Sequence, residues 1–145
     1  MRKLKKVDYI VVHYSATYIH KSWNHQALID CHKLRFGQCG YHFYVERDGS
    51  VYNTLNLEWQ GCHCKYSNYN SIGVCYEGGL FEEGSWGDTR TFEQKNALDT
   101  LLRALKLIYP DAVVMGHYQM PHAHTACPGF DAQKEYEYIS KFKVG

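Results

Sequence analysis

The sequence predicts an α/β fold in which a mixed β-sheet of about five strands is flanked by about three helices. Short apolar runs typical of buried strands alternate with stretches whose apolar residues recur at helical spacing. The chain of 145 residues is long enough to bury one core, and no repeat or linker divides it. Its 45% hydrophobic and 21% charged residues are typical of a globular protein. We therefore expect residues 1–145 to form a single domain.

The N-terminal part predicts a strand followed by a helix. The apolar run 9–12 indicates a buried strand, and the polar residues 15–21 indicate a loop. Ser22 can cap a helix that begins at about Trp23 and ends at Gly37. Four apolar residues of this helix recur at helical spacing, namely Ala27, Leu28, Cys31 and Leu34.

A hairpin and a long irregular segment follow. The strand expected over residues 41–46 leads into residues 50–53 through Asp48-Gly49, which is a strong hairpin signal. Residues 54–70 have no clean period and are rich in Asn, Gln, Gly and Tyr. Such a composition suits a loop that forms a cleft.

The second half begins with a strand over residues 72–76, then an exposed excursion over residues 81–90. Thr91 and Gln94 form a capping box for the clearest helix of the chain, which Pro110 stops. Its apolar residues are expected on one stripe, namely Leu98, Leu101, Leu102, Leu105 and Ile108. A last strand over 112–115 and a short closing helix over 132–142 complete the fold.

A possible metal site follows from the spacing of three residues. His117 comes directly after the last strand, and Cys127 lies ten positions further on. Imidazole nitrogen and thiolate sulfur both suit zinc, and a catalytic zinc needs three protein ligands plus an open position. His13, at the end of the first strand, is the best third ligand, because neighbouring strands would bring His13 and His117 to one rim. We therefore predict one zinc ion per chain, bound by His13, His117 and Cys127.

Other imidazoles and thiols leave alternatives open. His122 and His124 lie between the proposed ligands, and a loop could bring either of them to the metal in place of His117. The run Cys62-His63-Cys64 could begin a second metal site with Cys31 and Cys39, although the sequence has no Cys-x-x-Cys pair to complete it.

Six short strings occur in the order and spacing of a known family. They are Val12-His13-Tyr14-Ser15-Ala16-Thr17, Gly40-Tyr41-His42-Phe43, Arg47-Asp48-Gly49-Ser50-Val51-Tyr52, Asn70-Ser71-Ile72-Gly73-Val74, Gly116-His117 and Cys127-Pro128-Gly129. Over about residues 7–140 the chain resembles the zinc-dependent N-acetylmuramoyl-L-alanine amidases, the family of small phage amidase lysozymes and peptidoglycan-recognition proteins. The resemblance implies hydrolysis of the amide between N-acetylmuramic acid and L-alanine in bacterial peptidoglycan, as in an endolysin that degrades the cell wall.

The resemblance also implies catalytic residues. Tyr41 matches a tyrosine that orients the metal's water, assists proton transfer or donates a hydrogen bond to the oxyanion. Thr125 stands where phage enzymes typically carry Lys and catalytic peptidoglycan-recognition proteins carry Thr, so it offers a hydroxyl but no charge. Cys75 stands where a more distant branch places a catalytic Glu, and Glu77, on the same face of the strand, is a reserve candidate for the general base.

Substrate contacts are expected from the irregular segment. His63 matches a histidine that lines the cleft in the phage enzymes. Trp59 and Tyr69 could offer aromatic contacts, and Asn70 closes the segment, although aromatic residues in loops often only anchor them. His42 should point to the opposite face from Tyr41 and be buried.

Charge and cysteine content limit the compartment and the partners. A formal net charge of +1 gives no reason to expect nucleic acid binding, and no segment approaches the roughly 20 apolar residues of a membrane span. The basic cluster 2–6 precedes an apolar run too short for a signal peptide. With Cys127 as a ligand, five cysteines remain, which favours free thiols in a reducing cytoplasm. We expect cytoplasmic synthesis, with action on the cell wall after lysis or leaderless export.

Two other functions remain open. A recognition module could keep the fold without turnover, but such family members typically lose the cysteine ligand, whereas Cys127 and Tyr41 are both present here. A phage-type amidase could also bind and regulate a polymerase, which copurification would test. The oligomeric state is not predicted.

Overall fold

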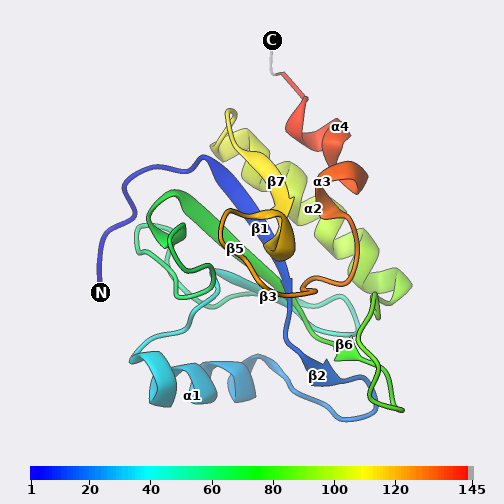
Figure 1. Ribbon diagram of the computed structural model, residues 1–145. Coiled ribbons are helices and arrows are strands. Elements are labelled where there is room, and N and C mark those ends of the chain that lie inside the picture. Colours follow the sequence, from blue (N-terminus) through cyan, green and yellow to red (C-terminus); the bar gives the residue numbers. More distant parts are fainter. Residues whose placement is uncertain (144–145) are drawn as a thin grey trace.

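Five strands form one mixed sheet in the computed structural model, which describes residues 1–143 (Figure 1). The strands are β1 (Tyr9–Tyr14), β3 (Phe43–Val45), β4 (Val51–Asn53), β5 (Ser71–Tyr76) and β7 (Val113–Gly116). Their order is β4-β3-β5-β1-β7, and all neighbours are parallel except β3 and β4, which form the expected hairpin. The predicted α/β class is confirmed. None of the helices within residues 1–143 is long and apolar enough to cross a membrane.

One face of the sheet is covered by α2 (Phe92–Ile108). The predicted capping box is present, because Thr91 Oγ1 accepts from the Gln94 N–H and Gln94 Oε1 accepts from the Thr91 N–H. Leu98, Leu102 and Leu105 are buried against β1 and β5. Ile108 was expected on this stripe but is 56% exposed. At 3.6 residues per turn it lies about 80° around the helix from Leu98, at the edge of the buried face.

The other face carries α1 (His25–Phe36), which stands apart from α2 in Figure 1. The helix is capped by Asn24, whose side chain accepts from the Ala27 N–H, so it begins later than the expected cap at Ser22. It ends at Gly37, which has a left-handed φ of 76° as a terminal glycine often does. The expected apolar stripe is wrong for its last two residues, because Leu34 is 92% exposed and Cys31 is exposed too.

Three local features differ from the sequence-based expectation. Residues 15–21 were expected as a loop, yet β2 (Thr17–Tyr18) pairs with β6 (Gly79–Leu80) in a separate two-stranded sheet. Tyr41 precedes β3 instead of starting it, and the carbonyl of its neighbour Gly40 accepts from the Cys62 N–H. The closing helix divides at Tyr136 into α3 (Ala132–Glu135) and α4 (Glu137–Ser140).

Strand alternation decides which β1 side chains face the core beneath α2. Ile10, Val12 and Tyr14 belong to the core cluster that includes α2. Val11 and His13 therefore point to the opposite face, where Gly73 and Cys75 of β5 lie beside them in register. His13 thus reaches the side of the sheet that carries α1, near the carboxyl end of β1.

Candidate metal centre

A cleft opens at the carboxyl ends of the parallel strands, with α1 as one wall. The residues that α1 contributes lie on one face of the helix, namely Leu28, Cys31, His32 and Arg35. This face corresponds in part to the stripe that the sequence suggested for the core. Leu28 and Cys31 are common to both sets, so this part of the expected stripe borders the cleft.

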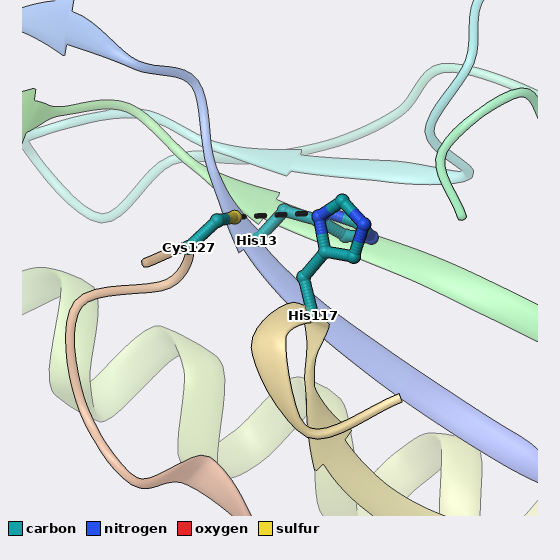
Figure 2. Close-up of side chains that lie close together, drawn as sticks. All are labelled: His13, His117 and Cys127. Atoms are coloured by element: carbon teal, nitrogen blue, oxygen red, sulfur yellow. Dashed lines mark hydrogen bonds between the residues drawn. The ribbon is translucent and has the colours of Figure 1, made fainter. Parts of the chain in front are cut away.

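Three side chains from separate segments converge at the base of the cleft (Figure 2). His13 comes from β1, His117 follows β7, and Cys127 lies in the loop before α3. Their ligand atoms all lie within 4.8 Å of one another, and His13 Nδ1 is 3.8 Å from Cys127 Sγ. Two imidazoles and a thiolate are a donor set that suits zinc, so these residues fit the expected ion. His122 and His124 are exposed and do not belong to this cluster.

The strand register brings the two histidines together. Val12 of β1 pairs with Gly116 of β7, so the residues that follow, His13 and His117, come to lie side by side with ring centroids 4.6 Å apart. Gly116 is also needed for the approach of the cysteine loop. A Cβ at this position would lie 2.9 Å from Pro128 Cδ, which is closer than side-chain contacts normally allow.

Contacts with β1, β5 and Arg90 fix the loop that carries Cys127. The Tyr14 N–H donates to Cys127 Sγ at 3.2 Å, and the Tyr76 hydroxyl donates to the Pro128 carbonyl at 2.6 Å. The Cys127–Pro128 peptide bond is cis. The Arg90 guanidinium lies 3.4 Å from the centroid of the Phe130 ring, close enough for a cation–π contact. These contacts fix the cysteine relative to β1 and β5.

Burial shifts the pKa values of the three candidate ligands. It lowers the pKa of His13 well below the ordinary value of 6.5, and the nearby His63 and His117 lower it further. Burial likewise lowers the pKa of His117, so both rings are neutral near pH 7 with a lone pair to offer. Burial raises the pKa of the Cys127 thiol to about 12 in the metal-free protein. A metal that binds Cys127 must therefore displace a proton.

Tyr41 lies beside the ligand cluster. Its ring centroid is 5.0 Å from that of His13, and the residue lines the cleft. Burial, followed by the neighbouring thiols of Cys75 and Cys127, raises the pKa of the Tyr41 phenol well above its ordinary value of 10. The phenol therefore keeps its proton near pH 7, which makes it a hydrogen-bond donor and a poor base.

Thr125 reaches the cleft from the cysteine loop. It is exposed, it lines the cleft, and its Oγ1 accepts from the Cys127 N–H at 3.1 Å. A hydroxyl that accepts this bond still has its own proton to donate. The structure thus brings Tyr41 and Thr125 to the same cleft as the three candidate ligands.

Glu77 is not brought to this cluster. It is buried, and its two carboxylate oxygens accept from the backbone N–H groups of Trp23 and Arg47 at 2.7 and 3.1 Å. It does not line the cleft. In this position its carboxylate joins the end of β5 to the segments before α1 and after β3, so its contacts are structural. Cys75 is fully buried beneath α1, as expected for a core thiol.

The expected substrate contacts also lie elsewhere. Trp59, Tyr69 and Asn70 do not line the cleft, and Asn70 is buried with its side-chain amide donating to Asp8. His63 is buried, and its Nδ1 lies 2.9 Å from His13 Nε2, beneath the ligand cluster. His42 is fully buried, as predicted.

Sequence reasoning missed Trp86. This residue lies in the segment expected only as an exposed excursion, is 53% exposed, and stacks on Tyr14 with ring centroids 5.5 Å apart. With Ala16, Thr125 and Ala126 it lines a hollow that continues the cleft beyond the ligands. A solvent-facing tryptophan between two glycines is a signal that could have marked this residue as a contact site.

Two histidines and a cysteine at the base of an open cleft form a candidate metal site, of the donor type that zinc hydrolases use. The chain belongs to the N-acetylmuramoyl-L-alanine amidase family, whose family model matches residues 3–130. The endolysin of Enterobacteria phage K11 is 35% identical over 133 residues, which cover 91% of this chain and 87% of the endolysin.

Two solved structures share the fold. The Ph2119 endolysin from Thermus scotoductus MAT2119 bacteriophage Ph2119 superposes with a TM-score of 0.75 at 26% identity, covering 97% of this chain and 88% of that endolysin. The N-acetylmuramoyl-L-alanine amidase LysC from Clostridium intestinale URNW gives a TM-score of 0.73 at 28% identity, covering 92% and 83%. The family and the enzyme class predicted from the sequence, an amidase that acts on peptidoglycan, are confirmed.

Proposed function

We propose that the protein hydrolyses the amide bond between N-acetylmuramic acid and L-alanine in the bacterial cell wall, using one zinc ion bound by His13, His117 and Cys127. The observation that carries this proposal is the convergence of three ligand atoms within 4.8 Å at the base of an open cleft. Three protein ligands and one open position are typical of catalytic zinc. The name of the related phage K11 protein, an endolysin, supports the cell wall as the place of action.

A bound zinc ion would supply a Lewis acid that polarises the scissile carbonyl and activates water near neutral pH. The chain's own residues supply the hydrogen bonds. The Tyr41 phenol, which keeps its proton, donates to the carbonyl oxygen as negative charge develops on it. The Thr125 hydroxyl donates from the facing loop. Loss of one such donor typically reduces kcat by about 10²- to 10³-fold.

The cleft extends to both sides of the ligand cluster, as a substrate cleaved at an internal bond requires. Arg35 and His32 border the end along α1, where a cation can meet the carboxylates of a stem peptide. Trp86 borders the opposite end, where its ring offers a flat apolar face to a sugar ring. We propose these residues, in place of Trp59, Tyr69 and Asn70, as the substrate contacts.

The test uses purified peptidoglycan. Amidase action creates new N-terminal alanine without new reducing sugar ends, whereas a glycosidase does the reverse. Wild-type protein should bind about one zinc per chain by elemental analysis and release alanine-terminated stem peptides. Cys127→Ala should lose both zinc and release, whereas Cys39→Ala, which removes a buried thiol outside the cluster, should keep both. New reducing ends, or release by metal-free Cys127→Ala, would contradict the proposal.

The alternative of a recognition module predicts a different result. Such a protein would bind zinc and peptidoglycan but release no stem peptide from any wall type. The retained cysteine ligand and the protonated phenol beside it support the enzyme instead.

A further inference from the structure

A buried chain of hydrogen bonds runs away from the ligand cluster into the protein. His13 Nε2 lies 2.9 Å from His63 Nδ1, and His63 Nε2 lies 3.3 Å from Ser71 Oγ. The Ser71 hydroxyl then donates to the Ser67 carbonyl at 2.6 Å. His13, His63 and Ser71 are 1%, 8% and 0% exposed. Any of these three side chains that loses its hydrogen-bond partner is therefore left buried and unsatisfied.

The Ser71 end of this hydrogen-bond series determines which atom donates and which accepts in each bond. The single proton of the Ser71 hydroxyl is given to the Ser67 carbonyl, so Ser71 Oγ can only accept from His63. His63 therefore carries its hydrogen on Nε2, and in a neutral ring Nδ1 is then the acceptor. His13 must donate to it from Nε2. This leaves Nδ1 of His13 with its lone pair, and Nδ1 is the atom that lies 3.8 Å from Cys127 Sγ.

The backbone is shaped to hold the His63 ring in this position. Gly73 of β5 and Gly61 border the ring, and a Cβ on either would come within 2.7–2.8 Å of its carbon atoms. Asn68 Oδ1 accepts from the N–H groups of His63 and Cys64 at 3.0 and 2.9 Å, which fixes the main chain. The ring therefore has little freedom to turn, and it does not line the cleft.

We propose that His63 is a positioning residue that selects the His13 tautomer with its lone pair on Nδ1 and aims that nitrogen at the metal. This inference rests on the proposed role of His13 as a metal ligand. Metal-binding histidines generally donate their second N–H to an acceptor, and loss of that acceptor typically weakens metal binding about 10- to 100-fold. Here the acceptor is a second imidazole, oriented in turn by Ser71.

The test compares variants of His63 with a matched control. His63→Leu removes the acceptor and keeps an apolar side chain in the space, whereas Gln in His63→Gln offers an amide oxygen that can accept again. His42→Leu removes another buried imidazole, whose hydrogen bonds go to Gly73 and Trp59 and not to His13. Zinc affinity is measured on the folded proteins by competition with a chromophoric chelator. The His13 tautomer is read from ring ¹⁵N chemical shifts in the metal-free proteins.

In wild type we expect His13 to carry its hydrogen on Nε2 alone. His63→Leu should give a mixture of tautomers and about 10- to 100-fold weaker zinc binding. His63→Gln should recover most of the affinity, and His42→Leu should retain it even if the fold is less stable. If His63→Leu does not fold, Ser71→Ala tests the same relay from its far end, and a mixed His13 tautomer is then the expected result.

Two results would overturn the inference: a wild-type His13 protonated on Nδ1, or zinc affinity and tautomer unchanged in both His63→Leu and Ser71→Ala. Failure of the proposed function would give a different result. A wild type that binds no zinc would contradict the metal site, and the His13 tautomer would still show whether His63 orients the ring.

Discussion

The sulfur of Cys127 lies 3.2 Å from the backbone nitrogen of Tyr14, the residue that follows His13 in β1. One backbone N–H thus places Cys127 directly beside His13 of β1, the two residues proposed as metal ligands. The bond also offers a partner to the thiolate that forms when a metal displaces the thiol proton.

Removing the metal should destabilise the protein, because His13, His117 and Cys127 come from three segments that a bound ion joins. Free zinc at about 100 times its dissociation constant should add about 2.7 kcal/mol to the free energy of unfolding. Thermal unfolding with and without a chelator measures this difference. In Cys127→Ala the chelator should have little effect on Tm, and an equal shift in both proteins would exclude this ligand set.

Tyr41→Phe should retain zinc and lose about 10²- to 10³-fold in kcat, because it removes the donor to the developing oxyanion and keeps the ring. Elemental analysis and stem-peptide release measure the two effects. Tyr52→Phe is the matched control, since Tyr52 stacks on His25 away from the cleft. A Tyr41→Phe variant with wild-type kcat would remove the phenol from the mechanism.

The metal-free protein should lose stability as the pH falls below about 6.5, the ordinary histidine value. Burial lowers the pKa values of His13, His42 and His63 in the folded state. In this window the unfolded chain binds more protons than the folded one, so acid favours unfolding. Each of these histidines contributes up to about 1.4 kcal/mol per pH unit.

Urea unfolding of chelator-treated protein at pH 7.5 and 5.5 measures this dependence. The free energy of unfolding should be lower at pH 5.5. An equal or higher value there would mean that the buried imidazoles are not held neutral in the folded state.

Trp86→Ala should raise KM for polymeric peptidoglycan and leave kcat largely unchanged, because Trp86 lies beyond the ligand cluster in the continuation of the cleft. Initial rates of stem-peptide release over a range of peptidoglycan concentrations separate the two constants. Trp59→Ala serves as the control, since Trp59 lies outside the cleft lining. If Trp59→Ala raises KM and Trp86→Ala does not, the contact originally expected from the sequence is correct.

Much of the fold could be predicted from the sequence because its signals are local. The capping box of α2 needs only Thr91 and Gln94, the β3–β4 hairpin turns at Asp48-Gly49, and apolar runs mark β1, β5 and β7. At α1 a tertiary contact overrode the local signal. The Trp23 N–H, next to the expected cap Ser22, donates to the Glu77 carboxylate, and the helix begins after Asn24 instead.

The three proposed ligands could be named from residue type, strand ends and motif spacing. The structure then brought them together, since the register of β1 and β7 sets His13 beside His117. The roles of the surrounding side chains were harder to predict from the sequence. Glu77 shares a strand face with Cys75 in the sequence pattern, yet its oxygens are occupied by backbone N–H groups from two other segments.

The sequence by itself determined the class of fold, the family and the identity of the candidate ligands, because these depend on periodicity, spacing and residue chemistry along the chain. Only the tertiary structure decided which residues surround the ligands. His63 and His13 are 50 positions apart, and their hydrogen bond exists because Gly61 and Gly73 leave space for a ring between them. Trp86 reaches the cleft by stacking on Tyr14, 72 positions earlier in the chain. Such contacts depend on chain packing over long distances, which no local pattern records.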